Sequence, residues 1–108
     1  MGMIKRGHVY LINLDPTIGL EVKKTRPCVV VSPNEMNQYI RTVVIAPMTS
    51  KQKYYKSRVG VSFQNKEGEI MLDQIRTVEK KRLISKLGAL SNRELKAVLS
   101  VLQEMFVY

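Results

Sequence analysis

Residues 14–27 read Leu-Asp-Pro-Thr-Ile-Gly-Leu-Glu-Val-Lys-Lys-Thr-Arg-Pro and form a long polar segment between two apolar runs. Both flanking runs, 10–12 and 28–31, have the β-branched or aromatic composition that is typical of strands. Hairpin connections usually take roughly 2–5 residues, so this segment is longer than joining two strands requires. It is either a binding loop or a surface loop whose basic residues keep the protein in solution.

Arg26 stands directly before Pro27, where this loop meets the second apolar run. Proline disfavours helical backbone in the preceding residue, so we expect Arg26 to be extended and its guanidinium to lie at the entrance of a strand. Cys28 follows in a valine-rich run and is expected to be a buried strand residue. A lone cysteine excludes an internal disulfide.

The rest of the chain alternates short apolar runs with turn residues. Strands are predicted at 7–14, 28–32, 42–47, 58–63, 70–72 and within 83–90, turns at 32–34 and 64–68, a polar stretch up to Tyr39, and a brief helical turn near 79–83. Pro47 is expected at the end of its strand because it cannot donate to a ladder.

The C-terminal residues give the clearest helix signal. Ser91 and Glu94 have the spacing of a capping box. Apolar residues then recur at helical spacing and predict one face that packs on the sheet: Leu95, Val98, Leu99, Leu102 and Phe106. Ala97, Val101 and Met105 widen this face enough for a subunit contact. The pattern predicts a mainly β (α+β) fold, an SH3-like small β-barrel with a C-terminal α-helix, in a single domain over 1–108.

The chain is basic, with 18 Lys and Arg against 9 Asp and Glu and a formal charge of +9. No acidic residue occurs between Glu35 and Glu67. Such an excess favours a polyanionic partner, either a nucleic acid or an acidic protein. Within the acid-free interval, Tyr54 and Tyr55 lie among lysines at 51–56, where they either stack on bases or pack against the barrel.

Other classes of protein are disfavoured. No apolar stretch approaches the roughly 20 residues of a membrane span, and no signal-peptide pattern opens the chain, so we expect a cytoplasmic protein. His8 is the only histidine, and no His/Cys cluster has metal-ligand spacing, so no metal or cofactor is expected.

Four strings occur in an order and spacing that resemble the MazF/PemK family over nearly the whole chain. They are Lys5-Arg6-Gly7-His8-Val9-Tyr10, residues 14–21, Arg26-Pro27-Cys28-Val29-Val30 and Asp73-Gln74-Ile75-Arg76-Thr77. The resemblance implies a toxin of a bacterial toxin–antitoxin pair, a homodimer that cuts single-stranded RNA, including mRNA, at short sequences without a metal. It also implies an acidic antitoxin that covers the RNA groove.

Metal-free cleavage uses the ribose 2′-hydroxyl as nucleophile and requires a cation for the charge that builds on the phosphoryl oxygens. Arg26 and Thr49 match the family's loop-closing arginine and the threonine after the third strand, and the resemblance makes them the catalytic candidates. Arginine is a poor base because its pKa lies above about 12, so Arg26 is assigned to transition-state stabilisation. The general base stays open.

Further RNA contacts are expected from the same matched segments. They are Glu21, Lys24, Ser50, Gln52, Asp73, Gln74 and Arg76. Asp73 has an alternative role in capping the turn between strands. Two positions depart from the family pattern, because this chain has Leu20 where some members carry histidine and Met71 where others carry arginine. A mechanism built on those residues does not transfer.

Two alternative functions are compatible with the same pattern. One is a non-enzymatic, gyrase-inhibiting toxin of the same fold, which would act through its C-terminal helix. The other is a plain nucleic-acid-binding barrel, which would bind RNA and DNA alike.

Overall fold

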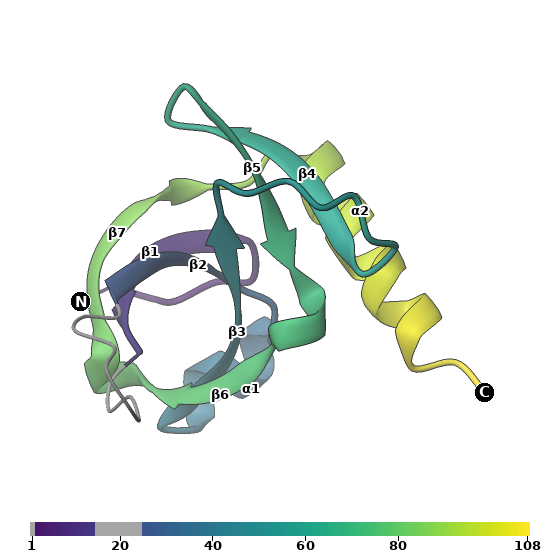
Figure 1. Ribbon diagram of the computed structural model, residues 1–108. Helices are drawn as coiled ribbons and strands as arrows, with labels where there is room; N and C mark the ends of the chain where they lie inside the picture. The colour runs from purple at the N-terminus through teal and green to yellow at the C-terminus, as the bar shows by residue number, and fades with distance from the viewer. Residues whose placement is uncertain (1, 15–24) are drawn as a thin grey trace, which may run out of the picture.

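The computed structural model describes residues 2–14 and 25–108 (Figure 1). Its strands are β1 (His8–Asn13), β2 (Thr25–Val30), β3 (Thr42–Thr49), β4 (Arg58–Phe63), β5 (Lys66–Met71), β6 (Arg76–Glu79) and β7 (Leu83–Ala89). Its helices are α1 (Asn34–Tyr39) and α2 (Asn92–Met105), with short 3-10 helices η1 (Leu72–Gln74) and η2 (Lys80–Arg82). Within these described ranges, neither α-helix has the length and apolar character that crossing a membrane takes.

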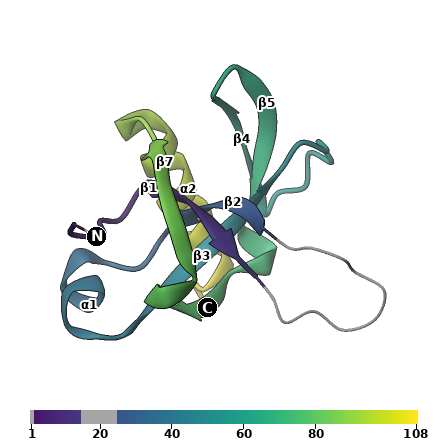
Figure 2. The ribbon, with the colours of Figure 1, turned by 90° about the vertical axis from the view of Figure 1, so that its left-hand side faces the viewer.

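The strands form one antiparallel sheet in the order β4-β5-β3-β2-β1-β7, and β6 pairs with β3. The sheet curls so that β1, β2, β3, β6 and β7 surround a common centre in Figure 1. The β4–β5 hairpin projects from this half-barrel, on a different side of the molecule from α1 (Figure 2). The predicted fold class, a small SH3-like β-barrel with a C-terminal helix, is confirmed.

The curled sheet is apolar on both faces. Successive residues of β2 alternate between two buried clusters, with Val29 in one and Cys28 and Val30 in the other. β3 alternates in the same way, with Ala46 and Ile45 on opposite sides. Burial on both faces explains why these strands appear in the sequence as continuous apolar runs rather than as an alternating pattern.

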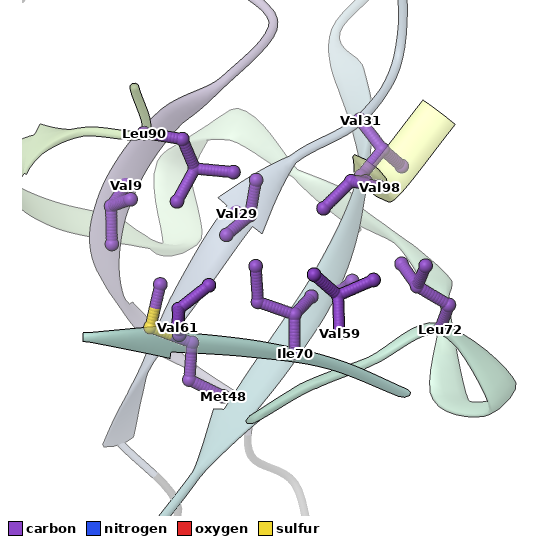
Figure 3. Close-up of a cluster of buried hydrophobic side chains, with 11 residues drawn as sticks. Val9, Val29, Val31, Met48, Val59, Val61, Ile70, Leu72, Leu90 and Val98 are labelled. Atoms are coloured by element: carbon purple, nitrogen blue, oxygen red, sulfur yellow. The ribbon is translucent and has the colours of Figure 1, made fainter. Parts of the chain in front are cut away.

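Helix α2 covers the first of these clusters. Ser91 Oγ accepts the Glu94 N–H at 3.1 Å while the Glu94 carboxylate accepts the Ser91 N–H at 3.0 Å, so the predicted capping box is present. Val98 is fully buried against the valines, methionine and isoleucine of the sheet (Figure 3). The predicted packing of Phe106 is wrong, because this residue follows the end of α2 and is 70% exposed.

Strand β3 extends to Thr49, so the prediction that it ends at Pro47 is wrong. Pro47 pairs with Cys28 of β2. On the other side of β3, the partner changes from β6, last paired at Ile45, to β5, first paired at Met48. A missing N–H donor is tolerated at such a break in the ladder.

The β4–β5 connection is shorter than predicted. Only Gln64 and Asn65 form the turn, with φ of 52° and 63°, and β5 begins at Lys66 rather than after Gly68. Two central residues with positive φ define the type I′ turn that suits the twist of a hairpin. The predicted turn at 64–68 is therefore wrong beyond its first two residues.

Helix α1 and strand β6 were not predicted. α1 is one short helix with a single buried side chain, Asn37, whose amide donates to the Ser32 carbonyl at 3.0 Å. The Ser32 hydroxyl in turn donates to the Asn37 amide oxygen and accepts the Val44 N–H. β6 has one buried residue, Val78. Both elements depend on tertiary contacts because neither has a hydrophobic period of its own.

Candidate active site

Arg26 and Thr49 come from strands that are neighbours in the sheet. Arg26 lies within β2 opposite Ile12 of β1, so its backbone is extended as Pro27 predicts. The β2–β3 register pairs Cys28 with Pro47. The ladder ends at this pair, and Arg26 and Thr49 each lie two residues beyond it, on the strand ends that line one cavity. Both side chains are half-buried.

A cavity of about 430 Å³ opens where these two strand ends meet the β4–β5 hairpin. It is lined by Thr25, Arg26, Pro27, Met48, Thr49, Ser50, Lys51, Val61, Phe63, Gln64, Lys66, Glu67, Gly68 and Glu69. Three cationic residues, Arg26, Lys51 and Lys66, and two acidic ones, Glu67 and Glu69, belong to this lining. Glu69 is paired with Arg58, so the cations of the lining outnumber its unpaired acid. A concave surface with excess positive charge and the Thr49 hydroxyl suits a phosphodiester.

The hydroxyl of Thr49 is held at the cavity by the chain that follows it. Its oxygen accepts a hydrogen bond from the Lys51 backbone N–H at 3.2 Å. Among residues 2–14 and 25–108 this hydroxyl donates to no other group, so its proton can be donated to an anion. On the other side of β3, Thr49 is the ladder partner of Glu69.

Glu69 is a buried acid at this cavity, only 2% exposed. Burial by itself raises the pKa of its carboxyl, but hydrogen bonds from the Tyr54 and Lys53 backbone and the Arg58 guanidinium outweigh burial and lower the pKa. Tyr54 N–H donates to Glu69 Oε2 at 2.8 Å, and Arg58 Nη1 lies 3.5 Å from Glu69 Oε1. The carboxylate is therefore ionised and paired.

Arg58 also holds Asp73. Its Nε donates to Asp73 Oδ1 at 2.7 Å and its Nη2 to Oδ2 at 3.2 Å, and the Ser57 hydroxyl donates to Oδ1 at 3.0 Å. The hydrogen bond from Arg58 lowers the pKa of the Asp73 carboxyl. This bidentate contact fastens η1 to the start of β4, and both roles predicted for Asp73, in RNA binding and in capping the turn, remain predictions.

The predicted site residues divide into three groups. Arg26, Thr49 and Ser50 line the cavity. Gln52, Asp73, Gln74 and Arg76 do not line it, although the charges of Arg26 and Arg76 both act on the Cys28 thiol, so Arg76 lies near the same strand. Glu21 and Lys24 lie outside the described residues, as does Leu20, one of the two departures from the family pattern. The RNA-binding roles in all three groups remain predictions.

The sequence interpretation missed Phe63, Lys66 and Glu69 as cavity residues. Lys66 lies in the basic interval without acidic residues, and Phe63 was assigned to a strand. Glu69 fell between the predicted turn at 64–68 and the predicted strand at 70–72. Met71, where some family members carry arginine, is buried and lies outside the cavity lining. No three His, Cys, Asp or Glu side chains gather as metal ligands among residues 2–14 and 25–108.

The fold and this cavity define a small basic half-barrel whose candidate site is built from strand ends. A family model described as the PemK-like, MazF-like toxin of type II toxin-antitoxin systems matches residues 5–106. The chain therefore belongs to this family of toxins.

Similar proteins agree with that assignment. The chain is 36% identical to the Endoribonuclease MazF of Staphylococcus saprophyticus, over 89% of this chain and 85% of the relative. A MazE-MazF structure from Deinococcus radiodurans has a TM-score of 0.83 at 24% identity and covers 97% of this chain and 96% of that chain. A mycobacterial endoribonuclease in complex with its cognate antitoxin has a TM-score of 0.82 at 21% identity, with coverages of 97% and 98%.

Proposed function

We propose that this toxin is a sequence-specific endoribonuclease that cleaves single-stranded RNA, including mRNA, in the cytoplasm. The observation that carries the proposal is that Arg26 and Thr49 line one cavity from two different strands. The 36% identical relative from Staphylococcus saprophyticus is named Endoribonuclease MazF, which supports the same activity.

The proposed reaction is a transesterification. The ribose 2′-hydroxyl loses its proton, and its oxygen attacks the adjacent phosphorus while the bond from phosphorus to the 5′-oxygen breaks. The leaving 5′-oxygen gains a proton, so that one proton is released and one is taken up. Arg26, a planar multidonor cation, stabilises the additional charge on the phosphoryl oxygens. The Thr49 hydroxyl donates a hydrogen bond to the same phosphate. No step requires a metal ion.

The assembly belongs to the proposal as well. We place residues 1–108 in one domain that acts as a homodimer, with an acidic cognate antitoxin as its protein partner. The formal charge of +9 favours both the antitoxin and RNA. The solved MazE-MazF complex of similar fold supports an antitoxin partner.

The test is incubation of the purified protein with a long single-stranded RNA and a DNA of the same sequence, both in EDTA. We expect RNA to be cut at a few recurring sites and to leave 5′-hydroxyl ends, and DNA to survive because it lacks the 2′-hydroxyl. RNA that stays intact at all protein concentrations would refute the proposal. DNA cleavage at the same sites would refute the 2′-hydroxyl mechanism.

A further inference from the structure

The loop between β3 and β4, residues 50–57, exposes two large aromatic side chains. Tyr54 is 79% exposed and Tyr55 is 55% exposed. The alternative that Tyr54 packs against the barrel is therefore wrong. The same loop carries Lys51, Lys53 and Lys56 and no acidic residue.

The backbone of Tyr54 adopts a conformation that tyrosine rarely takes. Its φ is +60°, in the left-handed region that is unfavourable for residues with a bulky side chain. Such a conformation persists only where the surroundings hold it, and such sites are often functional. Here the Tyr54 N–H donates to Glu69 Oε2 at 2.8 Å, and the Tyr54 hydroxyl contacts Gln52 Oε1 at 3.3 Å.

One ion-pair network holds both tyrosines. Glu69, which fixes the Tyr54 backbone, is paired with Arg58, and the Arg58 guanidinium lies 5.1 Å from the centre of the Tyr55 ring. Arg58 is itself held by the Asp73 carboxylate, with 2.7 Å between Nε and Oδ1. Only 9% of the Arg58 side chain and 3% of the Glu69 side chain are exposed. The loop is therefore fastened to β4 and β5 through the buried charges of Arg58 and Glu69, and to η1 through the partly exposed Asp73.

The network also reaches the candidate active site. Glu69 lines the cavity and is the ladder partner of Thr49. Glu69 thus has two contacts: its carboxylate accepts the Tyr54 N–H, and its backbone pairs with Thr49 at the end of β3. Ser50 and Lys51 of the same loop line the cavity, whereas Tyr54 does not. The Tyr54 ring is nevertheless carried by a loop that borders the cavity, and its backbone is bound to a carboxylate that lines it.

We propose that Tyr54 is a stacking surface for a nucleobase of the single-stranded RNA next to the cleaved bond, and that Arg58 and Glu69 are positioning residues that present it. The inference rests on the proposed ribonuclease function. Exposed aromatic rings among cations are the means by which proteins bind single strands, since rings stack on bases while lysines contact phosphates. The acid-free composition of the loop favours this occupant over a basic or neutral protein surface.

The first test measures KM and kcat on a short oligoribonucleotide that contains a mapped cleavage site. We expect Tyr54→Ala to raise KM about tenfold and Tyr54→Phe, which keeps the ring, to stay within about twofold of the wild type. Tyr39→Ala is the matched control, because Tyr39 is 81% exposed on α1, beside a different surface cavity. Its KM should not change.

A binding measurement separates stacking from catalysis. The probe is the same oligonucleotide with a 2′-deoxyribose at the cleaved position and 2-aminopurine at the neighbouring base. Stacking on Tyr54 should quench the 2-aminopurine fluorescence, and Tyr54→Ala should remove the quenching while Tyr39→Ala keeps it. Quenching that is equal in wild type and Tyr54→Ala would overturn the proposal.

The positioning role is tested by a double-mutant cycle with Arg58→Gln. If Arg58 acts through Tyr54, Arg58→Gln raises KM in the wild type and adds little in Tyr54→Ala. A merely structural role would lower the folded fraction, and hence the apparent kcat, equally in both backgrounds. If Arg58→Gln melts below the assay temperature, Arg58→Lys is used in the same cycle.

The remaining outcomes distinguish this inference from the proposed function. A wild-type protein that cuts no RNA refutes the proposed function. A wild-type protein that cuts RNA while Tyr54→Ala and Tyr39→Ala behave alike refutes only the stacking site. A change of oligomeric state in Tyr54→Ala, measured by size-exclusion chromatography, would assign Tyr54 to a contact between copies of the chain and overturn the inference.

Discussion

Thr49 and Glu69 are direct partners in the β3–β5 ladder. Their pairing connects the strand end that carries a proposed catalytic hydroxyl with the buried carboxylate that fixes the loop of residues 50–57. Gly68, the neighbour of Glu69, brings the two strands unusually close, since a Cβ at this position would lie 2.5 Å from the Thr49 carbonyl oxygen. A substitution that displaces β5 should therefore also displace Thr49 at the cavity.

Gly68→Ala is expected to push β5 away from the end of β3. Backbone cannot yield as a flexible side chain would, so we expect a loss of about 1–3 kcal/mol in the free energy of unfolding and a loss of RNA cleavage. Urea denaturation and cleavage rates measure the two effects. Gly60→Ala is the control, because nothing lies within 4 Å of a Cβ there. Equal losses in both variants would contradict the close approach.

Arg26→Ala should remove cleavage without unfolding the protein. The guanidinium lines an open cavity, so we expect kcat to fall about 100-fold or more while the free energy of unfolding changes by less than about 0.5 kcal/mol. Arg41→Ala, at an exposed position beside a different cavity, should keep full activity. Retained cleavage by Arg26→Ala would remove this residue from the mechanism.

The Asp73–Arg58 contact should stabilise the fold in a pH-dependent way. The hydrogen bond from Arg58 lowers the pKa of Asp73 below its ordinary 3.8, so the unfolded chain binds a proton first as the pH falls. The stabilisation is complete above the unfolded pKa and disappears as the pH passes through the folded pKa. We expect the stability difference between wild type and Asp73→Asn to be constant from about pH 7 to 5 and to shrink below about pH 4. Urea titrations at each pH measure it, and a pH-independent difference would exclude an ionic contact.

Cys28 should be unreactive in the folded protein. Burial raises the pKa of its thiol to about 12, and the nearby Arg26 and Arg76 offset only part of this shift. Because the thiolate is the nucleophile, we expect reaction with a disulfide reagent at about pH 8 to be at least 100-fold slower than in denaturant. The rate of absorbance change with and without denaturant checks this. Fast reaction of the folded protein would place the thiol at the surface.

Ser91→Ala should weaken α2 by removing the acceptor for the Glu94 N–H. Loss of such a cap costs about 1 kcal/mol, which should appear as a lower urea midpoint with an unchanged slope. Ser100→Ala, at an exposed position within the same helix, is the control and should be nearly neutral. If both variants were equally stable, the capping box would have no energetic role.

Local sequence patterns were sufficient for the elements whose signals lie within a few residues. The capping box at Ser91 and the apolar runs of β1, β2 and β4 predicted a helix and strands that the structure contains. α1 and β6 were missed because they are held by contacts from elsewhere, such as the Ser32 pairing of Asn37. The prediction that β3 ends at Pro47 was wrong because a proline is tolerated within this strand, where the neighbour of β3 changes from β6 to β5.

The same division applies to the candidate site. Arg26 and Thr49 were predicted from short motifs, and a polyanionic partner was predicted from the excess of basic residues. Charge and motif spacing are properties of the linear chain. Only the tertiary structure decided that the two residues share one cavity and that Glu69, which is paired with Arg58, lines it. The loop predicted at 14–27 ends in Arg26, which the structure places within β2, and strands far apart in the sequence complete the cavity. Burial and pairing of a charge depend on which strands become neighbours, and a linear pattern does not contain that information.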